Sequence, residues 1–540
     1  MAQFLAKKLN GGMGAIAISQ QGWLQRLILA LCLLVPMLSG FFDPDQQSLI
    51  AHDEGLYATR AREMLIQDDW IHPWDRPHHK TPGAYWLLAV MLRFLGTTEV
   101  AVRLPSLIAS LICAVLLYEV ARELLNPRVA LWSVLVLNTS FIWIQYSRFA
   151  TPDMVFVGLM LGCLLCLLKA ETVSKHRESL RFAAGAILSL AFLLRSFLVV
   201  LPIVAILPYL LLENRRHRHL NSLRLYLGMG LGLIPTLLWV WACWQRGNIE
   251  IVQTLAGFLV HKTTEDGGYL SNVLFYPTSI AMNSLPWWLF SLLGLGLLLK
   301  RPHSRQQRLL LGAATVIVCV LLSMASNKYH HYALVIYPGL AVLAGMGIEW
   351  LCHSRSRWSR RMVGMLAMFV GGLGGLLIIA GGVSVILAQH DQPLKEVVTL
   401  YLPSAMTLGL AWFVGTIVWF RTQRRSRWFV GLLVANWLAL SVAGTSGLLG
   451  NANPELKAFL QQREVQTIVA NNVIYFTPLR SKLSVLMRFY TPNPGPKVEG
   501  VEAVPKTEYA WVWEDAMGDI QVPHTVIDQF EQVYLIQVSD

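Results

Sequence analysis

Charged residues are scarce in this sequence: Asp, Glu, Lys and Arg make up 14% of its 540 residues, against roughly 25% in soluble domains. Hydrophobic residues make up 55%. A chain with so little polar surface cannot cover itself in water, so most of it must be solvated by lipid. The sequence therefore excludes a string of soluble domains. We also expect no nucleic-acid partner, although the net charge is +12, because in a membrane protein the placement of charges matters more than their sum.

Cysteine is also sparse, and none follows Cys352. The seven cysteines lie in or beside apolar runs, so no disulfide framework is indicated. A glycine-rich run, 371–382, lies inside an apolar segment and predicts close helix packing rather than a phosphate-binding loop.

Long apolar runs are abundant. The first, 23–42, lacks a small-x-small cleavage site, so we interpret it as a retained span rather than a signal peptide. Residues 182–212 are too long for one span and have basic flanks at both ends, which predicts two helices with Arg195 at the turn between them. Residues 83–96 are too short to span and predict an interfacial or re-entrant helix.

These runs predict an all-α polytopic membrane protein with about thirteen transmembrane helices in residues 1–448. Basic residues concentrate in alternate loops, which places the N-terminus in the cytoplasm of a multi-pass plasma (inner) membrane protein. The outer side then carries loops 43–103 and 245–284 and the tail 449–540. The tail predicts a small extracytoplasmic (periplasmic) α/β domain, with a helix near 454–463 and strands at 467–469, 473–476, 510–513 and 533–536.

The first outer loop is rich in ionisable residues. Asp53 and Glu54 begin a helical segment, and His72, His78, His79 and Lys80 follow within the same loop. Acidic residues at a helix start are often only caps. Dense ionisable groups held close to a membrane are costly, however, and so favour a functional site here.

Four short motifs, in order, resemble one family. They are the Asp-Glu pair after the first span, Lys80-x-Pro82-x-x-x-Trp86, Arg103-Leu104-Pro105 opening the second span, and Arg148-x-x-x-x-Asp153 after the third. This order is similar to that of the GT-C membrane glycosyltransferases. Within them, the protein O-mannosyltransferases and the aminoarabinose transferases that modify lipid A are the most similar.

The resemblance implies transfer of a sugar from a polyprenyl-phosphate donor to an acceptor hydroxyl at the outer face of the membrane. It implies Asp53 as general base, with Glu54 and Asp153 as further catalytic carboxylates. A carboxylate in hydrogen-bond reach of a hydroxyl is worth about 10²- to 10⁴-fold as a base. The acceptor stays open among lipid A, another glycolipid and a protein, and no nucleotide cofactor is expected.

The leaving group is a lipid phosphate, whose charge needs nearby cations. The candidates lie on the predicted outer side, although Lys and Tyr at such positions can also be interfacial anchors. The candidate phosphate-binding residues are Lys80, Arg148, Arg195, Lys328, His330, His331 and Tyr332.

A metal site is a further hypothesis. Lipid A aminoarabinose transferases carry Glu-Lys-Pro-Pro where this chain has His79-Lys80-Thr81-Pro82. In the family, that Glu and a His from the large outer loop can hold a divalent metal. His79 and His261 could hold a zinc-like ion here, but the same difference weighs against lipid A aminoarabinose transfer itself.

The alternative is a polytopic transporter or flippase of lipid-linked sugars. It predicts ionisable residues in the middle of several spans. Apart from Arg195, the predicted spans contain almost none, which favours an enzyme with its charges on the outer side.

Overall fold

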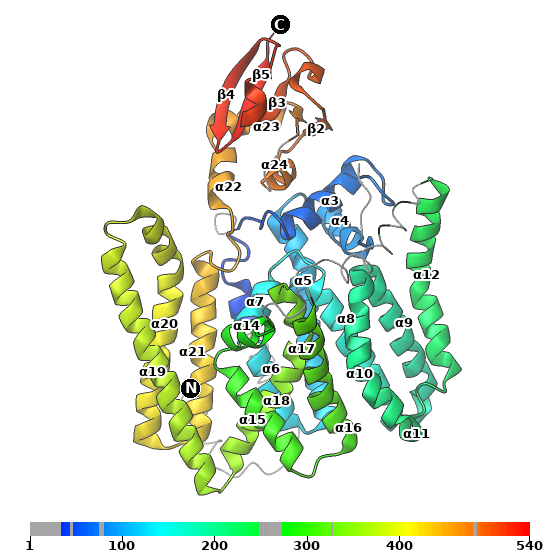
Figure 1. The fold of residues 1–540 in the computed structure, drawn as a ribbon, viewed down its shortest axis with the longest axis vertical. Coiled ribbons are helices and arrows are strands. Elements are labelled where there is room, and N and C mark those ends of the chain that lie inside the picture. The colour runs from blue at the N-terminus through cyan, green and yellow to red at the C-terminus, as the bar shows by residue number, and fades with distance from the viewer. Residues whose placement is uncertain are drawn as a thin grey trace.

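The computed structural model describes residues 34–43, 47–74, 80–247, 250, 254, 273–325, 328–478 and 483–539. Long apolar helices form a bundle, and a small β-sheet stands beyond one end of it, which we call the sheet-side end (Figure 1). Two short helices, α3 (Glu54–Ile66) and α4 (Gly83–Leu95), lie between the bundle and the sheet (Figure 1).

The bundle follows the apolar runs of the sequence. Its first half consists of α5 (Glu99–Leu124), α6 (Pro127–Leu137), α7 (Phe141–Ser147), α8 (Asp153–Thr172), α9 (Arg177–Arg195), α10 (Val200–Leu212) and α12 (Leu223–Gln245). Its second half consists of α14 (Phe275–Asn283), α15 (Trp287–Lys300), α17 (Ala314–Met324), α18 (Tyr337–His353), α19 (Arg357–Leu387), α20 (Gln392–Thr422) and α21 (Arg425–Thr445). The short connecting helices include η3 (Ser196–Val199), α11 (Asn214–His217) and η5 (His330–Val335). α16 (Arg305–Gln307) and η4 (Arg308–Ala313) run directly into α17, and the three form one helix, Arg305–Met324.

By length and composition, eight of the described helices could cross a membrane, or up to ten if each of two bent pairs is one span; this count takes Ser174–Leu212, which contains α9, η3 and α10, as one helix. The bent pairs are α6 with α7, at 71°, and α14 with α15, at 114°. The multi-pass architecture is therefore confirmed, whereas the count of thirteen spans is not. Most of the predicted first span lies outside the described residues.

Residues 182–212 form two helices that meet at Arg195, as predicted. Arg181, near the start of α9, donates a hydrogen bond to the carbonyl of His217, beyond the end of α10. The start of α9 and the end of α10 therefore lie together. The chain reverses between them at η3, where Ser196 has a φ of 47°.

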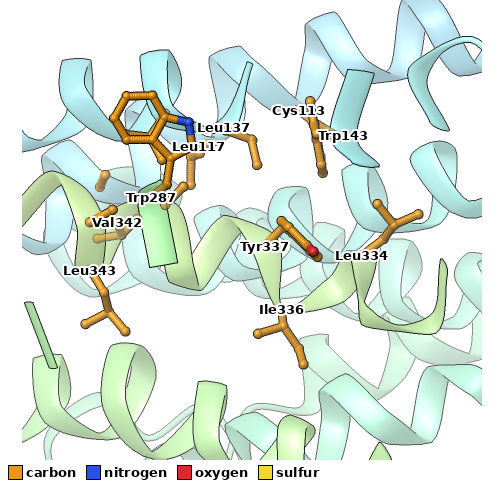
Figure 2. Packing of buried hydrophobic residues seen from close by; sticks show 14 of the residues in the cluster. Cys113, Leu117, Leu137, Trp143, Trp287, Leu334, Ile336, Tyr337, Val342 and Leu343 are labelled. Atoms are coloured by element: carbon orange, nitrogen blue, oxygen red, sulfur yellow. The ribbon is translucent and has the colours of Figure 1, made fainter. Parts of the chain in front are cut away.

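The core of the bundle is aromatic and closely packed. Trp143, Trp287 and Tyr337 are at most 2% exposed and come from α7, α15 and α18 (Figure 2). The predicted role of the glycine-rich run is confirmed between α19 and α20, because a Cβ on Gly374 would stand 2.6 Å from the carbonyl oxygen of Gly409. Side chains of ordinary size at these positions would force the two helices apart.

The tail folds as a five-stranded mixed sheet with helices α22 (Pro454–Leu460), α23 (Arg463–Asn471), α24 (Ser484–Tyr490) and α25 (Glu514–Met517). The strand order is β2-β1-β3-β5-β4. The strands are β1 (Ile474–Phe476), β2 (Pro494–Lys497), β3 (Tyr509–Trp513), β4 (His524–Phe530) and β5 (Val533–Val538). β1 pairs in parallel with β2 and β3, and β5 pairs antiparallel with β3 and β4.

The predicted strand at 467–469 is wrong, because these residues belong to α23. Val465 and Val469 are buried one helical turn apart, which is helical rather than strand periodicity. The predicted helix near 454–463 and the strands at 473–476, 510–513 and 533–536 correspond to α22, β1, β3 and β5.

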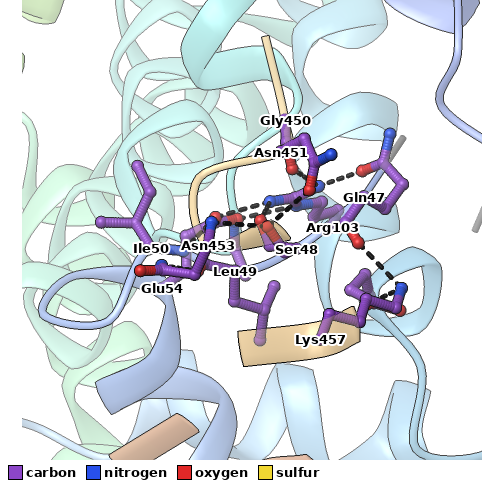
Figure 3. A network of polar contacts seen from close by, with 12 residues as sticks. Gln47, Ser48, Leu49, Ile50, Glu54, Arg103, Gly450, Asn451, Asn453 and Lys457 are labelled. Carbon is purple, nitrogen blue, oxygen red and sulfur yellow. Dashed lines mark hydrogen bonds and ion pairs between the residues drawn. The ribbon is translucent and has the colours of Figure 1, made fainter. Parts of the chain in front are cut away.

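The sheet is fastened to the first loop and to the bundle. One hydrophobic cluster contains Tyr57 and Met64 of α3, Leu88 of α4, Phe459 of α22 and Trp511 of β3. Beside it lies a polar network around Arg103 (Figure 3). Arg103 donates hydrogen bonds to Glu54, to Gln47, to the carbonyl of Ser48 and to the carbonyl of Gly450.

Candidate active site

The first predicted carboxylate, Asp53, stands at the N-cap of α3 with its side chain 41% exposed. It is therefore open to a ligand. One turn further along α3, the buried ring of Tyr57 lies under the ammonium of Lys80, 4.5 Å from Nζ to the ring centroid. This cation–π contact brings the Lys80 side chain to the start of α3.

Hydrogen bonds tie the segment that carries Lys80 to the turn that carries Arg195. The hydroxyls of Thr81 and Ser196 are 3.1 Å apart, and Thr81 Oγ1 donates to the carbonyl of Phe192 at 3.1 Å. Both residues are buried. The α9–α10 turn and the first loop therefore meet at one place, although more than one hundred residues separate them in the chain.

Arg195 pairs with Asp153. Arg195 Nη2 contacts Asp153 Oδ1, and the two side chains are only 11% and 5% exposed. Asp153 is the first residue of α8, where the helix dipole also favours a negative charge. The pair fixes the guanidinium of Arg195 at the sheet-side end of the bundle.

η5 contributes His331 and Tyr332 to the same site. The His331 imidazole lies 5.7 Å from the ring of Tyr146 in α7 and 4.7 Å from that of Tyr332, centroid to centroid. Burial lowers the pKa of His331, and the positive charges of Arg195 and Lys80 lower it further, whereas Asp153 and Asp53 oppose the shift. Burial also raises the pKa of Tyr332 to about 12. His331 is therefore a neutral imidazole near pH 7.

The structure thus brings together predicted residues from four distant segments. We call this group the charge cluster, and its members are Asp53, Lys80, Asp153, Arg195, His331 and Tyr332. It combines one exposed carboxylate with cations and a neutral imidazole beside the bundle.

Glu54, next to Asp53, has a different environment. Its side chain is fully buried and forms an ion pair with Arg103, which is also fully buried. Its two oxygens accept further bonds from the backbone N–H groups of Ala150, at 2.8 Å, and Ile50, at 3.1 Å. A carboxylate surrounded by donors in this way positions the loop, and its predicted catalytic role remains a prediction.

Arg148 contacts residues 39–41, near the start of the part of the chain that the structure describes. It is fully buried, and its Nη1 donates to the carbonyl of Ser39 at 2.5 Å. No contact described for Arg148 joins it to Asp153 or Arg195, so its predicted role in phosphate binding gains no support from its position.

Two predicted residues lie at the edge of the charge cluster. His330 is exposed and pairs with Ser279 of α14, 2.7 Å from Nδ1 to Oγ. Lys328 is half-buried on the segment that leads into η5. The same segment is anchored by Tyr276, which donates to the carbonyl of Tyr329 and accepts from its N–H.

The predicted metal ligands His79 and His261 both lie outside the described residues, so this hypothesis stays a prediction. Among the residues that the structure describes, no three His, Cys, Asp or Glu side chains come close enough to hold a metal ion.

Several residues of the site escaped sequence reasoning. Arg103 was visible in the Arg-Leu-Pro motif, but nothing in the sequence showed that it pairs with Glu54. Tyr57, Tyr146 and Ser196 resemble any aromatic or hydroxyl residue of a membrane helix. Only the tertiary contacts identify them.

The fold is similar to that of two solved transferases. The crystal structure of ArnT from Cupriavidus metallidurans bound to undecaprenyl phosphate has the same fold, with a TM-score of 0.75 and 20% identity, over 96% of this chain and 98% of that one. The apo oligosaccharyltransferase of Archaeoglobus fulgidus is more distant, with a TM-score of 0.52 and 11% identity over 89% of this chain and 65% of that one.

Sequence similarity leads to the same group. The family described as dolichyl-phosphate-mannose-protein mannosyltransferase matches residues 75–241. The undecaprenyl phosphate-alpha-4-amino-4-deoxy-L-arabinose arabinosyl transferase of Edwardsiella ictaluri is 24% identical over 452 residues, 78% of each chain. The transferase of the same name from Pectobacterium atrosepticum is 26% identical over 430 residues, 75% of this chain and 73% of its own length. The resemblance predicted from the four motifs is therefore confirmed.

Proposed function

We propose that this protein is a polyprenyl-phosphate-dependent glycosyltransferase that moves a sugar from its lipid carrier to an acceptor hydroxyl at the outer face of the membrane. The observation that carries the proposal is the charge cluster itself. An exposed carboxylate, Asp53, shares the sheet-side end of an apolar bundle with Lys80, Arg195 and His331.

The bundle also offers room for hydrocarbon below this cluster. A cavity of about 120 Å³ lies among α5, α8, α10, α17 and α18, lined by apolar side chains such as Leu161, Ile206 and Val318. Its α8 residues begin at Val157, one turn from Asp153. An apolar cavity beside cations suits a ligand with a phosphate head and a hydrocarbon tail.

The charge cluster offers a base for the acceptor hydroxyl and cations for the phosphate of the donor. Asp53 takes the proton of the acceptor hydroxyl as its oxygen bonds to the anomeric carbon. The bond from that carbon to the phosphate oxygen breaks, and the phosphate keeps the electron pair. Lys80 and Arg195 stabilise the negative charge that develops there.

Asp153 acts through Arg195 in this scheme. Its carboxylate is buried and already paired, so it holds the guanidinium rather than binding the acceptor. We therefore treat Asp153 as a positioning residue.

The donor and acceptor to test first follow from the similarities. The relatives are named for transfer from undecaprenyl phosphate-linked 4-amino-4-deoxy-L-arabinose. We propose lipid A as the acceptor, ahead of other glycolipids and proteins, because the aminoarabinose transferases that the motifs resemble modify lipid A.

The test is transfer of radiolabelled sugar from this donor to lipid A by the full chain in liposomes. We expect Asp53→Asn to lower the turnover rate by about 10²- to 10⁴-fold. Asp68→Asn is the matched control, because Asp68 is an exposed carboxylate of the same loop with a φ of 49°, which asparagine tolerates well. Unchanged transfer by Asp53→Asn would reject Asp53 as the base. Absence of transfer by the unsubstituted protein would favour the transporter.

A further inference from the structure

Two turns at the end of the bundle opposite the sheet carry many arginines and no acidic residue. They connect α18 to α19 and α20 to α21 (Figure 1). The sequence has no Asp or Glu between Glu349 and Asp391, or between Glu396 and Glu455. Exposed arginines lie on these turns and on the helix ends beside them, and we call them the arginine patch: Arg355, Arg357, Arg360, Arg361, Arg421 and Arg427.

Hydrogen bonds hold the two turns side by side. Arg425, the first residue of α21, donates through Nη1 to the carbonyl of Leu351 at 2.8 Å and to Ser359 Oγ at 3.0 Å. Thr416 of α20 donates to the carbonyl of Ala367 in α19 at 2.8 Å, which packs the end of α20 against the start of α19. The arginines of the patch therefore belong to one surface, although they come from two separate turns.

Connections in the first half of the bundle combine both signs of charge. Arg216, between α10 and α12, contacts Glu171 at 2.6 Å and Glu213 at 2.9 Å, and Arg181 of α9 pairs with Glu178. In the part of the chain that the structure describes, by contrast, no carboxylate forms an ion pair with an arginine of the patch. A bias of positive charge towards one side of a membrane requires no such difference. The patch therefore concentrates positive charge that attracts an anion.

The helices that adjoin the patch expose apolar surface. Trp358, in the first turn of α19, is 55% exposed, and its ring lies 5.6 Å from that of Trp350, centroid to centroid. Tryptophan at a helix end is typical of the headgroup level of a membrane. Further large exposed side chains follow along α19 and α20, namely Met365, Met368, Phe369, Phe413, Ile417 and Phe420. A ligand with an anionic head and hydrocarbon chains complements both surfaces.

We propose that the arginine patch binds the phosphate of an anionic phospholipid, whose acyl chains lie along α19 and α20. Arginine suits this role because its planar guanidinium group can donate two parallel hydrogen bonds to phosphate oxygens. A zwitterionic phospholipid carries an ammonium group beside its phosphate, so the patch attracts it less. The charge cluster lies at the other end of the bundle, and the proposal therefore does not rest on the proposed function.

The test is native mass spectrometry of the full chain in detergent, titrated with phosphatidylglycerol or with phosphatidylcholine of the same acyl chains. We expect phosphatidylglycerol to bind at least tenfold more tightly. Arg360→Gln combined with Arg421→Gln should raise its apparent dissociation constant about tenfold, because each exposed ion pair contributes about threefold. Arg355→Gln combined with Arg427→Gln should have the same effect and provides a second, independent pair.

Lys175→Gln combined with Arg215→Gln is the matched control. Both are exposed basic residues of connections in the first half of the bundle, and this pair removes the same amount of charge. We expect the control to leave the dissociation constant unchanged. Thermal unfolding without added lipid verifies that each variant is folded.

Three results would overturn the proposal. Equal binding of the two lipids would show that the patch does not select for charge, and equal weakening by the patch pairs and the control pair would show a diffuse effect of net charge. Displacement of phosphatidylglycerol by the same concentration of inorganic phosphate would show a site for a free anion. Sugar transfer is not measured, so each of these outcomes leaves the proposed function intact.

Discussion

At the scale of single residues, neighbouring carboxylates have opposite environments. Asp53 is 41% exposed, whereas Glu54 is fully buried against Arg103. Breaking a buried ion pair by removing one partner typically costs about 3–5 kcal/mol, because the other charge is left uncompensated. Loss of the Glu54 carboxylate should therefore lower the stability of the protein, whereas loss of the Asp53 carboxylate should lower sugar transfer and leave stability almost unchanged.

We predict that Glu54→Gln lowers the free energy of unfolding by about 3–5 kcal/mol, because Arg103 keeps its charge without a counterion. Asp53→Asn should change stability by less than about 0.5 kcal/mol, as expected of an exposed side chain. Thermal unfolding in detergent, read by tryptophan fluorescence, measures both. Equal melting temperatures for the two variants would show that the Glu54–Arg103 pair does not hold the loop.

His331 predicts a pH dependence of stability. Its pKa in the folded protein is lowered by burial from the usual value of about 6.5, so the unfolded chain binds the proton more readily. The contribution of His331 is therefore fully present above pH 6.5 and is lost as the pH falls through 6.5 towards the lowered pKa.

We expect His331→Gln to flatten the loss of stability on acidification from about pH 7 to pH 5. His330→Gln is the control, since His330 is exposed on the same turn. Unfolding midpoints measured across this pH range test the prediction. An acid limb that is the same in the His331 variant as in the unsubstituted protein would contradict it.

At the scale of elements, the site depends on how closely α4 approaches α9. A Cβ on Gly83, the first residue of α4, would stand 2.6 Å from the carbonyl oxygen of Leu193 in α9. This contact lies next to the Thr81–Ser196 hydrogen bonds that hold the Lys80 segment. A larger residue at position 83 must therefore move the segment that carries Lys80.

We predict that Gly83→Ala destabilises the protein by about 1–3 kcal/mol through overpacking and reduces sugar transfer, because Lys80 is displaced. Gly230→Ala is the control, since a Cβ there meets nothing within 4 Å in α12. That change should leave stability the same or raise it by up to about 1 kcal/mol. Chemical denaturation and transfer assays on the two variants decide the matter, and indistinguishable results would refute the prediction.

At the scale of the whole molecule, the C-terminal sheet and the first loop form one structural unit. Arg62 of α3 donates hydrogen bonds of 2.6–2.8 Å to the carbonyls of Arg488, Phe489, Thr491 and Pro492. Burial, together with the charge of Arg488, lowers its pKa to about 10, so it remains protonated near pH 7. Lys457 adds an ion pair of 2.5 Å with Glu99 at the start of α5.

We predict that Arg62→Gln lowers the free energy of unfolding by about 2–4 kcal/mol, since several buried carbonyls lose a charged donor. It should also make the junction between α21 and α22 more sensitive to protease. Arg463→Gln is the control, because Arg463 is exposed on α23. Limited proteolysis and thermal unfolding test this, and a variant as resistant as the control would show that Arg62 does not fasten the sheet.

The apolar runs determined the bundle by themselves, because the cost of burying unpaired backbone groups in lipid leaves helices as the available structure. The turn at Arg195 followed from charge balance at the two ends of 182–212. The strand predicted at 467–469 failed because a short apolar run fits a helix or a strand equally well. Which of the two forms was decided by the burial of Val465 and Val469.

The sequence also determined which polar residues are available for chemistry, since carboxylates and cations near a membrane are costly and therefore few. Only the tertiary structure decided which of them meet. Asp53 and Glu54 are adjacent in the chain, yet the Asp53 side chain is 41% exposed while Glu54 is buried against Arg103, and Arg148 donates its hydrogen bond to the carbonyl of Ser39. The physical reason is that a charge is placed by its nearest partners in space, and residues far apart in the chain supply these partners.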